Sequence, residues 1–132
     1  MKKRWWLAIV IVVLVIGGGG LAWRQYQATR PTGGVPTVVV HGYSGTAGST
    51  NQMIAALTRS GVAKRTMRVT VTTDGQLQVQ GSLYGKNPIV QVIYQDNRNG
   101  KQLTNWLLKV DAMLHRRYHV QRVNAVGHSA GA

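Results

Sequence analysis

An uncharged apolar segment near the N-terminus constrains this chain more than any other feature. The segment Trp5–Trp23 contains the unbroken aliphatic stretch Leu7–Ile16 and directly follows the basic sequence Lys2-Lys3-Arg4. Such a stretch is unfavourable in water and favours the core of a bilayer, with its basic end held on the cytoplasmic side. We therefore expect residues 1–23 to be a signal anchor or a signal peptide that exports the rest of the chain.

Two fates of this segment remain open. Cleavage is favoured by the glycine run Gly17–Gly20, which would break the helix, and by the small-x-small sequence Gly20-Leu21-Ala22. Retention is favoured because a span of this length nearly crosses the hydrocarbon core and Arg24 would stop its outer end. We favour retention, which predicts a single-pass protein of the cell membrane with an extracellular domain. Cleavage would give a secreted or cell-surface protein.

The next residues, 24–35, are predicted to be a linker. They are polar, carry Pro31, Gly33 and Gly34, and show no apolar period. A folded domain is then expected over residues 36–132.

Strands and helices alternate in this domain. We predict strands where β-branched residues cluster, helices where apolar residues recur at helical spacing, and a hairpin around the turn sequence Asp74-Gly75. The expected elements are strand 37–40, helix 50–60, hairpin 68–81, strand 89–94, helix 103–118 and strand 123–126. This order predicts an α/β fold with a mostly parallel sheet, in which the hairpin is an insertion or an edge feature.

The composition narrows the classes of partner. Sixteen basic residues against three aspartates give a formal charge of +13. This charge favours an anionic membrane or envelope surface, unless acidic residues lie in sequence beyond this chain. The basic residues are scattered and match no nucleic-acid-binding motif, so we expect no nucleic acid partner. Cysteine is absent, which excludes disulfides and thiolate metal sites, and we expect neither a cofactor nor a metal.

A candidate catalytic motif directly follows the last apolar strand. The sequence Gly127-His128-Ser129-Ala130-Gly131 fits the G-x-S-x-G pattern, in which a serine lies on a sharp strand-to-helix turn. The glycines are needed because that turn leaves no room for bulkier neighbours. The pattern makes Ser129 a candidate nucleophile, and the preceding strand strengthens this interpretation.

A second motif, His41-Gly42-Tyr43-Ser44-Gly45, follows the first strand. A loop after an early strand supplies one backbone N–H of the oxyanion hole in serine hydrolases of this type, and the residue after the nucleophile supplies the other. We expect Tyr43 and Ala130 to be these two donors. Losing one such donor typically costs roughly 3 kcal/mol of transition-state stabilisation.

The remaining titratable residues are weaker candidates. His128 neighbours the serine, but the position before the nucleophile usually points elsewhere. The pair His115 and His119 is interpreted as part of a solvated basic helix face. Asp96 and Asp111 precede the serine, whereas the triad order of this fold is serine, acid, histidine.

From about Pro36 onward, roughly three quarters of the chain, the sequence resembles the Gram-positive cell-surface α/β-hydrolases, a lipase- and esterase-like family. The predicted hairpin matches as well. The matching stretches are Val40–Thr46, Ser49–Ile54, Asn87–Val92 and Asn124–Ser129.

The resemblance implies that Ser129 is the nucleophile and that the His41–Tyr43 loop forms part of the oxyanion hole. The acid and histidine of the family lie further along and have no counterpart here. We therefore expect this chain to be the N-terminal portion of an α/β-hydrolase fold, truncated after the elbow and inactive alone.

Three functions are compatible with these observations. The leading one is hydrolysis of an ester or other acyl bond in a small-molecule or lipid substrate outside the membrane, by a Ser-His-Asp type mechanism. The runner-up is a non-enzymatic, membrane-anchored basic module that binds anionic cell-envelope polymers. The third is acyl transfer to an acceptor other than water by the same serine chemistry.

Overall fold

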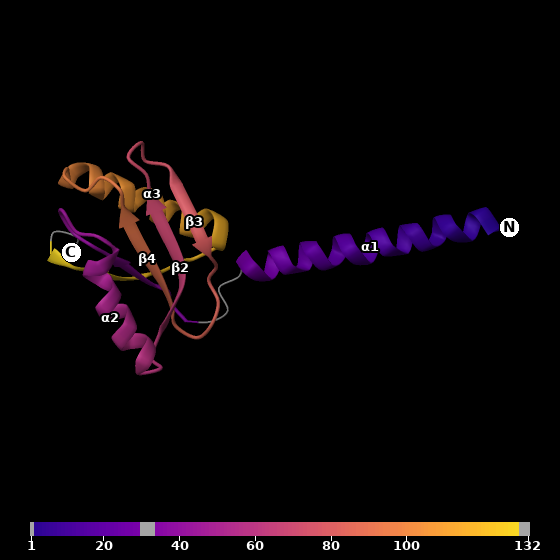
Figure 1. Ribbon diagram of the computed structural model, residues 1–132, viewed down its shortest axis with the longest axis horizontal. Helices are drawn as coiled ribbons and strands as arrows, with labels where there is room; N and C mark the ends of the chain where they lie inside the picture. The colour runs from indigo at the N-terminus through magenta and orange to yellow at the C-terminus, as the bar shows by residue number, and fades with distance from the viewer. Residues whose placement is uncertain (1, 30–33, 130–132) are drawn as a thin grey trace.

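The computed structural model describes residues 2–29 and 34–129 of the chain (Figure 1). Three helices and five strands follow one another in the order α1, β1, α2, β2, β3, β4, α3, β5. Their bounds are α1 Lys2–Thr29, β1 Thr37–Val40, α2 Ala47–Arg59, β2 Lys64–Val71, β3 Leu77–Gly81, β4 Pro88–Tyr94, α3 Gly100–Tyr118 and β5 Asn124–Gly127.

The five strands form one mixed sheet in the order β3-β2-β4-β1-β5. Parallel pairing joins β2 to β4, β4 to β1 and β1 to β5, and the single antiparallel pair joins β2 to β3. The predicted α/β class with a mostly parallel sheet is therefore confirmed. The hairpin lies at one edge of the sheet, so its antiparallel strand does not interrupt the parallel strands.

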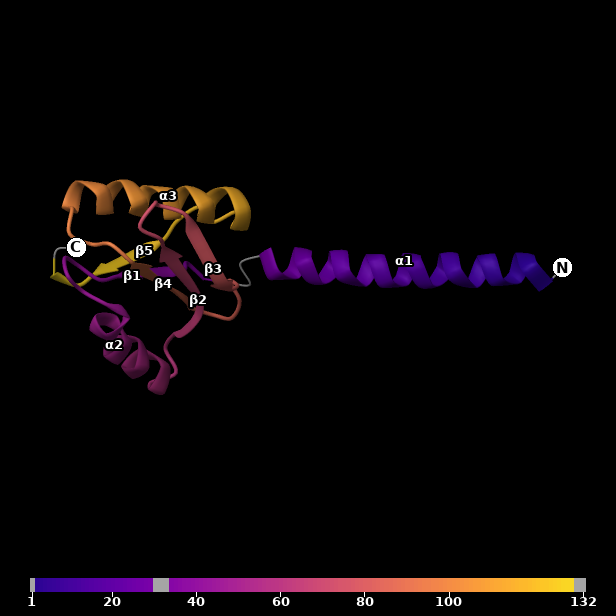
Figure 2. The ribbon, with the colours of Figure 1, turned by 45° about the horizontal axis from the view of Figure 1, so that its top comes forward.

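Helices cover both faces of this sheet: α3 lies over one face and α2 over the other (Figure 2). The strands between them are buried on both sides, which explains why β1 and β4 are almost continuous apolar runs. On the α3 side, Val38, Val92 and Leu114 belong to a large buried cluster. On the α2 side the buried apolar cluster comprises only Val39, Ile54 and Ile89.

Both domain helices begin three residues before their predicted starts. The start of α2 is fixed by a capping box, in which the Thr46 N–H donates to Ser49 Oγ at 3.1 Å. The start of α3 is fixed by Asn99, whose side-chain oxygen accepts from the Gln102 N–H at 3.2 Å. Both caps are polar side chains that satisfy N–H groups at the helix start. The apolar periodicity of the sequence therefore does not reveal where these helices begin.

The N-terminal helix α1 is longer than expected. It runs without a break through Gly17–Gly20 and continues to Thr29, across half of the predicted linker. The rest of that linker up to residue 33 lies outside the described residues. Within α1, Trp5–Gln25 is long and apolar enough to cross a membrane, a property that cleaved signal sequences share. Glutamine and alanine after Arg24 are good helix formers, which accounts for the extension.

Candidate active site

The two candidate motifs meet at one edge of the sheet. Strands β1 and β5 are adjacent and parallel, with Val40 opposite Gly127, so the segments that follow them emerge side by side. The His128 N–H extends this pairing by donating to the Val40 carbonyl at 3.1 Å. In open α/β sheets, ligands bind at this carboxyl edge of the strands.

Ser129 is held in a conformation that L-amino acids rarely adopt. It follows β5 after one residue, its side chain is exposed, and its φ angle is +60°. A left-handed serine one residue after a strand is the backbone geometry expected of a nucleophile elbow, in which strain presents the hydroxyl at the sheet edge. Ala130 and Gly131 lie outside the described residues, so their predicted roles stay predictions.

The loop after β1 is built around a buried histidine. His41 is fully buried; its Nε2 accepts from the Tyr94 N–H at 3.1 Å, and its Nδ1 lies 3.1 Å from the Gly42 carbonyl oxygen. Because a carbonyl can only accept, the proton is on Nδ1 and the ring is neutral. Both ring nitrogens are therefore engaged, and His41 holds the loop to β4 rather than acting as a base.

The same loop is closed by a tight turn. The Gly45 N–H donates to the Gly42 carbonyl at 3.0 Å, and Ser44 between them has a φ of +54°. A Cβ at Gly45 would lie 2.9 Å from His41 Nδ1, so this position accepts only glycine. Tyr43 lies in the turn with an exposed side chain, and no described residue accepts a hydrogen bond from its N–H. That N–H is available to a ligand.

Asn97 supports this loop from the neighbouring strand end. It follows β4 and donates from Nδ2 to the Gly45 carbonyl. Asn97 is not among the residues that the sequence predicts for the site. Its position just after a strand that shares the sheet edge with β1 is the signal that could have identified it.

A family model described as "Alpha/beta hydrolase of unknown function (DUF915)" matches residues 24–132. The chain belongs to this family of α/β-hydrolases.

Two solved structures are similar to this chain. One is a gene product of Listeria innocua, with a TM-score of 0.67, 27% identity, and coverage of 74% of this chain and 40% of that one. The other, from Lactobacillus plantarum WCFS1, is named a "putative cell surface hydrolase", with a TM-score of 0.65, 26% identity, and coverage of 74% and 42%. No curated protein sequence matches significantly. The chain thus spans about two fifths of the length of these structures.

These comparisons confirm the resemblance inferred from sequence and the α/β-hydrolase fold, of which the chain covers a part. They support a hydrolase as the class of protein. The name of the L. plantarum structure and the apolar helix α1 are both compatible with a location at a membrane or cell surface.

The other candidate titratable side chains lie in structural contacts or at the surface. His115 Nδ1 is 3.0 Å from the Val120 carbonyl oxygen, and His119 ends α3 in a left-handed conformation with a φ of +56°. Asp96 accepts from the Arg98 N–H in its loop at 3.3 Å, and Asp111 is exposed on α3. In the described part of the chain, no hydrogen bond joins the Ser129 hydroxyl to a histidine.

The aromatic rings of Tyr94 and Trp106 pack behind His41. Tyr94 packs edge-on against the His41 ring with centroids 5.5 Å apart, and it stacks on Trp106 at 6.1 Å. Burial raises the pKa of Tyr94 to about 12, so this phenol carries no charge in the ordinary pH range. These rings help to bury the His41 side chain, which anchors the loop.

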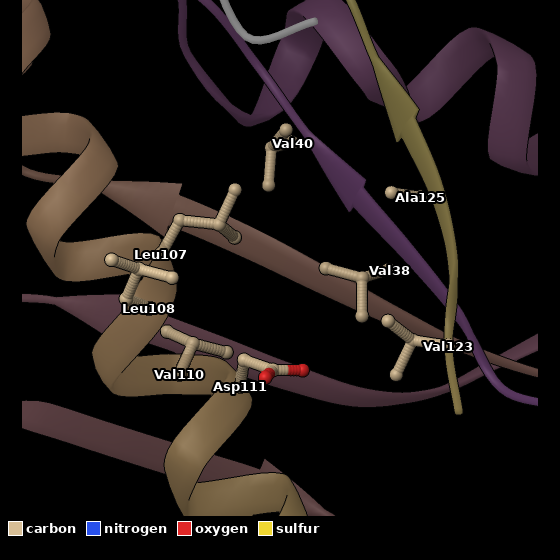
Figure 3. Close-up of a pocket in the computed structure, with 8 residues that line it drawn as sticks. All are labelled: Val38, Val40, Leu107, Leu108, Val110, Asp111, Val123 and Ala125. Carbon is tan, nitrogen blue, oxygen red and sulfur yellow. The ribbon is translucent and has the colours of Figure 1, made fainter. Parts of the chain in front are cut away.

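An apolar pocket of about 210 Å³ lies between α3 and strands β1 and β5 (Figure 3). Neither Ser129 nor the loop after β1 lines this pocket, so it is separate from the candidate site. It marks a part of the sheet face that α3 leaves uncovered. Its lining residues are Val38, Val40, Leu107, Leu108, Val110, Asp111, Val123 and Ala125.

Proposed function

We propose that this hydrolase cleaves an ester or other acyl bond with Ser129 as the nucleophile. The observation that carries the proposal is the left-handed Ser129 directly after β5, beside the turn that leaves the Tyr43 N–H available. A nucleophile and an oxyanion donor on adjacent strands are the two parts that acyl transfer needs at one edge of a sheet.

In the first chemical step, Ser129 Oγ attacks the carbonyl carbon of the substrate and loses its proton to a base. The carbonyl oxygen becomes an oxyanion, which would accept hydrogen bonds from the Tyr43 and Ala130 N–H groups. When the tetrahedral intermediate collapses, the leaving alkoxide takes the proton from the base. Water then cleaves the acyl-enzyme by the same steps and restores the serine.

The base of this mechanism is not His41, whose two ring nitrogens are engaged with Tyr94 and Gly42. In this fold the triad acid and histidine follow the nucleophile in sequence. We therefore propose that the base is a histidine that follows Ser129 in the whole protein, since this chain matches only part of the solved structures.

The substrate in this proposal is a small molecule or a lipid that carries an acyl group on the outer side of the membrane. The basic residues before α1 and its apolar span support an orientation with the sheet outside the cytoplasm. Acyl transfer to an acceptor other than water would use the same serine and oxyanion donors, and hydrolysis is favoured because the family is one of hydrolases.

The test measures hydrolysis of a p-nitrophenyl ester by membranes of the native host that carry the protein. Ser129→Ala is expected to lower turnover by about 10³-fold or more, because the nucleophile is lost. Ser60→Ala, at the exposed end of α2, serves as the matched control and should leave turnover unchanged. Equal turnover in the wild type and Ser129→Ala would refute the proposal.

A further inference from the structure

A cationic groove lies between α2 and β2, on the opposite half of the sheet from Ser129. Its volume is about 490 Å³. Half of its lining residues are cations: Arg59 from the end of α2, and Lys64, Arg65 and Arg68 from β2. None of the three aspartates of the chain lines it. The positive charge of the groove is therefore not neutralised by a carboxylate among its lining residues.

A β-bulge places two of these arginines on the same face of the sheet. Arg65 and Arg68 are three residues apart, and in a regular strand their side chains would point to opposite faces. The pairing of β2 with β4 shifts by one residue between Arg65 and Met67, so that Arg65 lies opposite Ile89 and Arg68 opposite Gln91. Both of those β4 residues face α2, since Ile89 packs in the α2-side cluster and Gln91 bonds to α2.

One of the two arginines is locked in place. Arg65 Nη1 donates to Gln91 Oε1 at 2.7 Å. Gln91 is fully buried, and its Nε2 donates to Thr50 Oγ1 at 2.8 Å and to Asn51 Oδ1 at 2.9 Å. The hydrogen bonds of Gln91 hold the guanidinium of Arg65 in position before any ligand binds, which lowers the entropic cost of binding.

The other arginine has an unused donor. Arg68 Nε is buried and has no hydrogen-bond partner among the described residues. Thr66 Oγ1, in the bulge, is in the same state. Buried polar groups are nearly always paired, so the lack of an internal acceptor at Arg68 means that no described residue competes with an anion for this guanidinium at the groove.

We propose that this groove binds a linear polymer that carries repeated phosphate groups, outside the membrane. The cations from Lys64 to Arg68 extend over roughly 13 Å of strand, further than a single phosphate reaches, so several charges of one chain would be engaged. Arginine pairs with phosphate through two N–H groups and suits this task better than lysine. No aromatic residue lines the groove, so it offers no surface on which nucleic acid bases could stack.

The test uses the full chain in nanodiscs of neutral phosphatidylcholine and fluorescent short-chain inorganic polyphosphate as the probe. The double variant Arg65→Gln/Arg68→Gln is expected to bind the probe at least tenfold more weakly. Its log–log salt slope should fall by roughly 1.4, since each neutralised charge of a single-stranded polyanion contributes about 0.7. Inorganic phosphate at equal phosphate concentration should compete poorly.

The matched control is Arg116→Gln/Arg122→Gln, which removes the same charge from exposed positions outside the groove. This control should bind within about twofold of the wild type. Equal losses in both double variants would show an effect of net charge alone and overturn the site.

A second double variant, Arg59→Gln/Lys64→Gln, tests the groove without disturbing the buried network, because both side chains are exposed. It should weaken polyphosphate binding severalfold with an unchanged circular dichroism spectrum, and unchanged binding would contradict the proposal. Tighter binding to a single-stranded oligonucleotide or to phosphatidylglycerol vesicles than to polyphosphate would assign the groove to nucleic acid or to the membrane, and would also overturn it. Ester hydrolysis should be the same in all groove variants, which separates this proposal from the proposed catalysis.

Discussion

The two faces of the sheet differ sharply in what they bury. The α3 face buries a cluster of fifteen residues, almost all apolar. The α2 face buries three apolar residues and, next to them, the polar pair Thr50 and Gln91. The α3 face therefore supplies most of the hydrophobic stabilisation, whereas the α2 face buries hydrogen-bonded polar groups that orient the charged side chain of Arg65.

The helices explain this division. The buried residues of α3 include Leu103, Trp106, Val110 and Leu114, a stripe at helical spacing along its whole length. The shorter α2 buries only Thr50 and Ile54. A helix with so narrow an apolar stripe leaves room at its side for the cationic groove.

The largest expected effect compares one leucine from each helix. Leu114→Ala on α3 should lower the free energy of unfolding by about 2–5 kcal/mol, because Leu114 is fully buried in the large cluster. Leu57→Ala on α2 should cost less, because Leu57 is only partly buried. Chemical denaturation of the full chain, followed by circular dichroism, measures both. Equal losses of stability in the two variants would contradict the difference between the two faces.

The next expected effect removes the polar centre of the α2 face. Gln91→Leu keeps the approximate volume but leaves Thr50 without its donor and Arg65 without its acceptor. The free energy of unfolding should fall by about 1–3 kcal/mol, the usual cost of buried groups left unpaired. Gln95→Leu, at an exposed position just after β4, is the control. A Gln91→Leu protein as stable as the wild type would show that the network contributes nothing.

A smaller effect is expected where the site loop is held. Asn97→Ala removes the hydrogen bond to the Gly45 carbonyl and should cost about 1 kcal/mol of stability. Ester turnover should fall at the same time, because the Tyr43 N–H would lose its fixed position. Asn105→Ala on the exposed side of α3 should change neither quantity. Unchanged turnover in Asn97→Ala would separate this residue from the site.

Near neutral pH the smallest effect is that of Tyr94 ionisation, which appears only when the pH is raised. The folded pKa of Tyr94, about 12, is raised by burial above its ordinary value of 10.0, so folding favours the neutral phenol. Its contribution is complete below pH 10 and is lost as the pH rises through 12, by roughly 1–3 kcal/mol. Unfolding curves of the wild type and Tyr94→Phe should therefore diverge over this window. Parallel curves would contradict the assignment.

Much of the fold follows from local chemistry. Strand β1 has its predicted bounds, and the hairpin was predictable because Asp74-Gly75 favours a tight turn between alternating residues. The early start of α2 depends on the side chains of Thr46 and Ser49, which carry no apolar period. The extension of α1 to Thr29 was missed because Pro31, Gly33 and Gly34 suggested a linker for the whole of residues 24–35, although its first half contains good helix formers.

The two motifs of the site could be predicted from the sequence, but the residues that hold them and the groove in place could not. Ser129 and the loop after β1 each follow an apolar strand, so their motifs can be identified along the chain. Asn97 reaches Gly45 across 52 residues, and Arg65 reaches Gln91 across 26. Such contacts depend on strand order and on a bulge, which single-sequence patterns do not encode.

Covalent labelling of the active site shows whether Ser129 is an activated nucleophile. The protein in membranes of its native host is treated with a fluorophosphonate probe, and the modified peptide is mapped by mass spectrometry. We expect the phosphonyl group on Ser129, no labelling of Ser129→Ala, and normal labelling of Ser60→Ala. Labelling that survives Ser129→Ala, or no labelling of the wild type, would contradict the role of Ser129 as the nucleophile.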